Sequence, residues 1–91
     1  MPWQAQRDRT VRRVLRQPPT ASVQAALGLA SGAPDHEVMQ AVRLAMRLLH
    51  PDRGLNVQLR GTSKGNSLEA AFKRVNNLKD HFERDRGHDH Q

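Results

Sequence analysis

Between Pro34 and Pro51 the chain carries one continuous helical pattern of apolar side chains. They recur at i, i+4, i+7, i+8 and i+11, which are Val38, Val42, Ala45, Met46 and Leu49. This spacing predicts an amphipathic helix whose apolar face must be covered by another element. Pro34 suits a first helical turn, and Pro51 ends the helix because the residue before a proline avoids the α region.

Two further helices are predicted on either side. A short one begins after Pro18-Pro19, with Thr20 or Ser22 as its cap, and ends at Gly28. A long one begins after Asn66 or Ser67, and residues 50–66 between the two longer helices form a glycine-containing loop. The fold class is therefore all-α: a short first helix packed on an antiparallel two-helix hairpin. The predicted core consists of Leu27, Val38, Val42, Ala45, Met46, Leu49, Phe72, Val75, Leu78 and Phe82.

The composition excludes several classes of protein. The chain has 91 residues and no cysteine, which excludes a disulfide scaffold, a thiol nucleophile and a cysteine-based zinc site. No apolar run approaches the length of a membrane span. A triad of His50, Asp52 and Ser63 or Ser67 lacks an evident pocket in a glycine-containing loop, so we expect no enzyme, cofactor or metal site. We expect an intracellular monomer and leave its compartment open.

The positive charge is concentrated at the beginning of the chain. Fifteen basic residues oppose nine acidic ones, for a net charge of +6, and residues 1–19 hold five arginines and one aspartate. We interpret residues 1–19 as a basic arm or linker, residues 20–86 as the domain, and residues 87–91 as a polar tail. Such an arm favours an anionic partner, either nucleic acid or a membrane surface, and an arginine-rich organellar targeting segment is a further interpretation.

One short motif stands at a position that gives it weight. His50-Pro51-Asp52 directly follows the second predicted helix and opens the loop of the helical hairpin. Other features precede and follow it in a fixed order. They are Leu27-Gly28-Leu29, Glu37-Val38, Ala41, Arg53, Phe72, Val75 and Asn76. In this order and spacing, residues 22–83 resemble the J-domain of the DnaJ/Hsp40 co-chaperones.

The chain departs from the J-domain pattern at several positions. Val42 and Leu49 stand where the family usually has tyrosine, and both keep an apolar side chain for packing. The cationic face of the second helix is reduced to Arg43 and Arg47, with Arg53 after the motif. The loop is long for the family, and a fourth helix is not evident. These departures concern the affinity for a partner more than the fold.

The resemblance implies a co-chaperone that binds the ATP-bound state of an Hsp70 and stimulates its ATP hydrolysis. By analogy, the Hsp70-binding residues are Arg43, Arg47, His50, Pro51, Asp52 and Arg53. One alternative is a degenerate J-like scaffold that serves as an interaction module in a larger assembly. Another is a basic helical module that binds nucleic acid. The Hsp70 function requires Arg43, Arg47 and Asp52, whereas phosphate binding requires the arginines of residues 7–16.

Overall fold

The computed structural model describes residues 3–87, and the predicted all-α class is confirmed for this part of the chain. Its elements are α1 (Trp3–Arg16), α2 (Val23–Ala26), α3 (Asp35–Leu49), the 3-10 helix η1 (Gly54–Leu59) and α4 (Ser63–Gly87). None of these helices combines the length and the apolar character that crossing a bilayer requires. Of the predicted polar tail, residues 88–91 lie outside the described residues.

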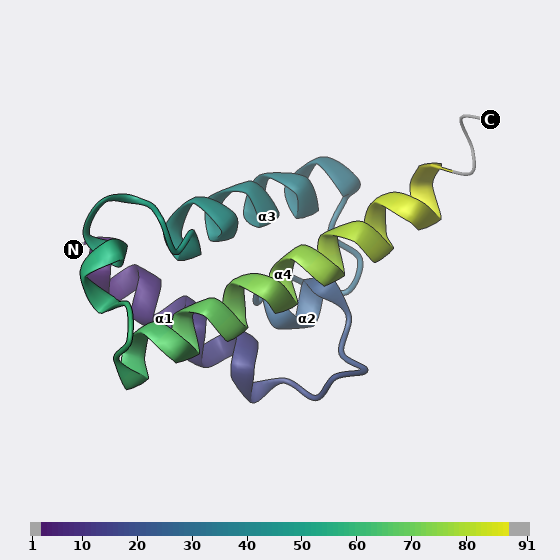
Figure 1. The fold of residues 1–91 in the computed structure, drawn as a ribbon. Helices are drawn as coiled ribbons and strands as arrows, with labels where there is room; N and C mark the ends of the chain where they lie inside the picture. The colour runs from purple at the N-terminus through teal and green to yellow at the C-terminus, as the bar shows by residue number, and fades with distance from the viewer. Residues whose placement is uncertain (1–2, 88–91) are drawn as a thin grey trace.

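The two longest helices form the centre of the molecule. α3 and α4 run in opposite directions and pack along their apolar faces, while α2 lies against α4 (Figure 1). Ser22 caps α2 by accepting a hydrogen bond from the backbone of Ala25, and Gly28 follows α2 with a φ of 75°, as its predicted cap role requires. The buried core consists of Val14, Val23, Leu27, Val38, Val42, Ala45, Leu49, Leu68, Ala71, Val75 and Phe82.

α1 corrects the prediction that residues 1–19 form an arm. This helix packs against both α3 and α4, and Val14 is completely buried. Arg7, Val11 and Val14 fall at i, i+4 and i+7, so they share the inward face of the helix. Leu15, four positions after Val11, lies outside this inward face and is 39% exposed. The domain thus begins with α1, and the chain reaches α2 through a segment that Arg74 of α4 holds by donating to the carbonyl of Pro18.

An ion-pair cluster joins α1 to the beginning of α4. Asp8 accepts a hydrogen bond from Arg7 at 3.0 Å and lies 3.3 Å from the ammonium group of Lys64. Partial burial by itself raises the pKa of Asp8, but the hydrogen bonds and charges of Arg7 and Lys64 outweigh it and lower this pKa overall. The cluster therefore favours the docked position of α1 at neutral pH.

The segment between α3 and α4 is shorter and more ordered than the predicted loop. η1 occupies its centre, and α4 begins at Ser63 rather than after Asn66 or Ser67. The hydroxyl of Thr62 caps α4 by accepting from the backbone of Gly65 at 2.9 Å. Gly65 lies in the first turn of α4 directly against the carbonyl of Leu59, where a Cβ atom would collide with the backbone. This glycine marks a close approach of two helices, although it falls within the predicted loop of residues 50–66.

The packing of α1 predicts different costs for two neighbouring truncations. We expect Val14→Ala to lower the free energy of unfolding by about 2 kcal/mol, because it removes two buried methyl groups and leaves a cavity. Leu15→Ala should change it by less than about 0.5 kcal/mol, because that side chain is exposed. Urea unfolding followed by circular dichroism measures both. Equal values for the two variants would contradict the packed helix.

Candidate functional site

An open groove between α3 and α4 brings together five of the six predicted site residues. Pro51, the sixth, is half-buried in the turn and does not line the groove. The lining residues are Met39, Val42, Arg43, Met46, Arg47, His50, Asp52, Arg53, Lys79 and Glu83. The groove thus has an apolar floor from α3 and a charged rim from both helices and the loop.

The rim of the groove carries mainly positive charge. Arg43 and Arg47 are one helical turn apart on α3, and both are exposed. Lys79 of α4 extends this cationic rim and pairs with Glu83 at 3.8 Å. Lys79 was not among the predicted site residues, because a helical pattern does not show which neighbouring helix a surface residue will face. Four cationic side chains oppose two carboxylates in the lining, which suits an acidic surface on a partner.

His50 connects the groove to the core. Its Nδ1 atom accepts a hydrogen bond from the backbone of Asp52 at 3.2 Å, and its ring meets the ring of Phe72 edge-on with 5.2 Å between centroids. In the neutral imidazole this leaves Nε2 to carry the proton. The ring is therefore oriented from two sides while its exposed position keeps it available to a partner.

Asp52 is exposed and is paired within the chain. Its carboxylate accepts a hydrogen bond from the guanidinium of Arg60, which follows η1, and both side chains are 63% exposed. An ion pair with this exposure contributes about 0–1 kcal/mol, so a cationic group on a partner can replace Arg60 at little cost. Arg60 is a residue that the sequence analysis missed, since nothing in the sequence pairs it with Asp52.

A buried network of hydrogen bonds holds the C-terminal end of α3 in place. Asn56 of η1 is only 1% exposed, and its amide nitrogen donates to the carbonyls of Leu48 at 3.0 Å and His50 at 2.8 Å. Its side-chain oxygen accepts from Arg7 of α1 at 2.8 Å. Arg7 is also buried and lies over the ring of Trp3 at 5.3 Å. The network couples α1 to the backbone that carries His50, although neither Arg7 nor Asn56 lines the groove.

The groove offers charged and hydrogen-bonding side chains around apolar ones. Ser63 and Ser67 line a different groove between α1 and α4, so the described residues do not assemble the triad with His50 and Asp52. Nor do three metal-ligating side chains gather anywhere within residues 3–87.

Comparisons of the sequence and the structure with protein-family models, curated proteins and solved structures found no match.

Proposed function

We propose that this protein is a J-domain-type co-chaperone that binds an Hsp70 chaperone and stimulates its ATP hydrolysis. The observation that carries the proposal is the common groove that Arg43, Arg47, His50, Asp52 and Arg53 line. The order of elements also supports it. A short helix precedes α3, the His-Pro-Asp sequence follows α3, and α4 returns alongside it. This order agrees with the family that the sequence resembles.

In this proposal the two ends of the groove have different roles. Arg43 and Arg47 attract and orient an acidic surface of the Hsp70, which predicts binding that weakens with added salt. Pro51 fixes the turn, His50 offers its ring, and Asp52 exchanges Arg60 for a charged or polar group of the Hsp70. The protein catalyses no reaction itself. It favours the hydrolysing conformation of its partner through contacts that this conformation alone accepts.

Single-turnover ATP hydrolysis by purified Hsp70 proteins tests the proposal. We expect the wild-type chain to raise the hydrolysis rate and His50→Gln to abolish that rise. His36→Gln is the matched control, because His36 is exposed in the first turn of α3 and does not line the groove. Hsp70 proteins from several compartments are tested. If the wild type stimulates none of them, the proposed function is wrong and the J-like scaffold becomes the better interpretation.

A further inference from the structure

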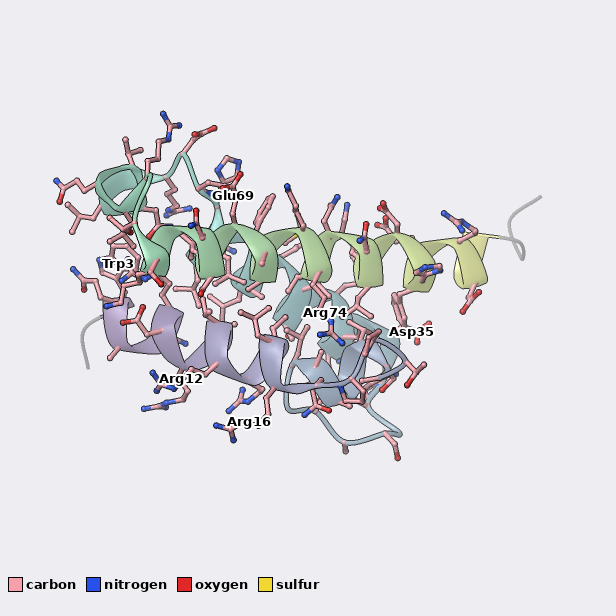
Figure 2. All side chains as sticks on the ribbon, turned by 60° about the horizontal axis from the view of Figure 1, so that its bottom comes forward. Trp3, Arg12, Arg16, Asp35, Glu69 and Arg74 are labelled. Atoms are coloured by element: carbon pink, nitrogen blue, oxygen red, sulfur yellow. The ribbon has the colours of Figure 1, made fainter. Side chains whose placement is uncertain are left out.

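The outer face of α1 carries a stripe of arginines that the Hsp70 proposal does not use. Arg9, Arg12, Arg13 and Arg16 fall at i, i+3, i+4 and i+7, so they project from one side of the helix. All four line one cleft, whose other residues are Gln17, Ala25 and Gly28. Figure 2 shows Arg12 and Arg16 pointing away from α4. We call these four residues the arginine stripe.

One acidic side chain lines a groove together with two members of the arginine stripe, Arg12 and Arg16. The only acidic residue of α1 is Asp8, and it is engaged by Arg7 and Lys64 on the side that faces α4. Within residues 3–87, no ion pair involves Arg12 or Arg16. Arg13 is held in place because its guanidinium lies against Gly28 and donates to the carbonyl of Leu27 at 3.5 Å. Arg12 and Arg16 therefore present unpaired positive charge to solvent, beside the partly preorganised guanidinium of Arg13.

The chemistry of the stripe selects among anionic partners. Protein interfaces centre on buried aromatic or aliphatic anchors, and the cleft beside the stripe offers no larger apolar side chain than Ala25. A membrane-surface helix buries its apolar face in lipid, but Val11 and Val14 of α1 face the protein core. Single-stranded nucleic acids stack on aromatic side chains, and the one aromatic residue of α1, Trp3, lies against Arg7. Arginine forks match phosphate oxygens in pairs, without any need for base contacts.

We propose that the arginine stripe binds the phosphate backbone of duplex nucleic acid without sequence preference. The stripe and the groove lie on different flanks of α3. The flank of α3 toward α1 carries Ala41, Ala45 and Leu48, which line a cleft with Arg9 and Arg13, whereas Arg43 and Arg47 line the groove. Duplex binding therefore leaves the groove accessible. This inference does not depend on the Hsp70 proposal.

Fluorescence anisotropy with a labelled DNA duplex of mixed sequence tests the inference across a salt series. Four phosphate contacts predict a slope of log affinity against log salt of about −3.6, which is about 150-fold between roughly 50 and 200 mM salt. Arg12→Gln/Arg16→Gln should halve the slope to about −1.8, leaving about a 12-fold change. The matched control Arg43→Gln/Arg47→Gln removes the same charge from the groove and should keep the wild-type slope.

Several outcomes would overturn the inference. Equal slopes for the two double variants would mean that net charge alone attracts the duplex. The same conclusion against the stripe follows if the wild type fails to bind the duplex at low salt. Polyglutamate and phosphatidylserine vesicles are tested in the same way. If the wild type binds either one more tightly than the duplex, and Arg12→Gln/Arg16→Gln abolishes that binding, the stripe is assigned to that partner instead. Circular dichroism spectra of all variants should match the wild type, since all four substituted side chains are exposed.

Discussion

Asn56→Ala should lower the free energy of unfolding by about 3 kcal/mol. The substitution removes a side chain that makes three hydrogen bonds while 1% exposed. It leaves the carbonyls of Leu48 and His50 without this donor, and it removes the hydrogen-bond acceptor that Asn56 provides for the buried guanidinium of Arg7. Orphaned buried polar groups cost about 1–3 kcal/mol each, and more when one is charged, which sets the size of the effect. Urea unfolding measures it.

The control for Asn56→Ala is the same substitution at an exposed asparagine. Asn77 of α4 is exposed, and Asn77→Ala should change stability by less than about 0.5 kcal/mol. A double-mutant cycle with Arg7→Met isolates the contact between α1 and η1, and we expect a coupling of about 1–3 kcal/mol. If Asn56→Ala lowers the free energy of unfolding no more than Asn77→Ala does, the network does not stabilise the fold.

The network also predicts an effect on the groove. Asn56 holds the carbonyl of His50 directly, so its loss releases the backbone that orients the imidazole. At temperatures where the Asn56→Ala variant remains folded, we expect weaker Hsp70 stimulation than in Asn77→Ala. α1 lies outside the part of the chain that resembles a J-domain. It is nevertheless connected to the site, because Arg7 of α1 donates a hydrogen bond to Asn56, and Asn56 holds the carbonyl of His50.

The elements that could be predicted from the sequence are those whose patterns are local. The bounds of α3 follow from its apolar stripe and its two flanking prolines, and both flanking prolines lie just outside the helix. α1 could not be recognised as a packed helix, because its inward face combines two valines with an arginine. In a sequence, an arginine normally indicates a residue that faces solvent. Arg7 is tolerated inside because Asp8 and Asn56 accept its hydrogen bonds, and Asn56 lies 49 positions later in the chain.

The site divides in the same way between local and distant information. The sequence places Arg43, Arg47, His50 and Asp52 near one helix end, and a helical period is enough to predict that they lie close together. Lys79 and Glu83 come from α4, and their place on the rim depends on how α4 rotates against α3. The pairing of Asp52 with Arg60 depends on the 3-10 turn of η1, for which the glycine-flanked segment carries no periodic signal.

Asp52→Asn should abolish the stimulation of Hsp70 and leave the fold intact. Asparagine keeps the shape of the side chain and removes only its negative charge. Because Asp52 is exposed, the loss of its pair with Arg60 should cost no more than about 1 kcal/mol of stability. The expected loss of function then comes from the missing charge at the contact with the Hsp70. Single-turnover hydrolysis measures the stimulation, and urea unfolding verifies the fold.

Arg60→Gln separates the two roles that the Asp52 carboxylate can have. Both variants break the same ion pair, but only Asp52→Asn removes the group that is proposed to meet the Hsp70. We therefore expect Arg60→Gln to stimulate as well as the wild type, because the freed carboxylate still faces the partner. Equal loss of stimulation in both variants would show that the ion pair acts by holding the loop in its conformation. Full stimulation by Asp52→Asn would remove Asp52 from the proposed contact altogether, and with it the main reason to place the partner at the end of α3.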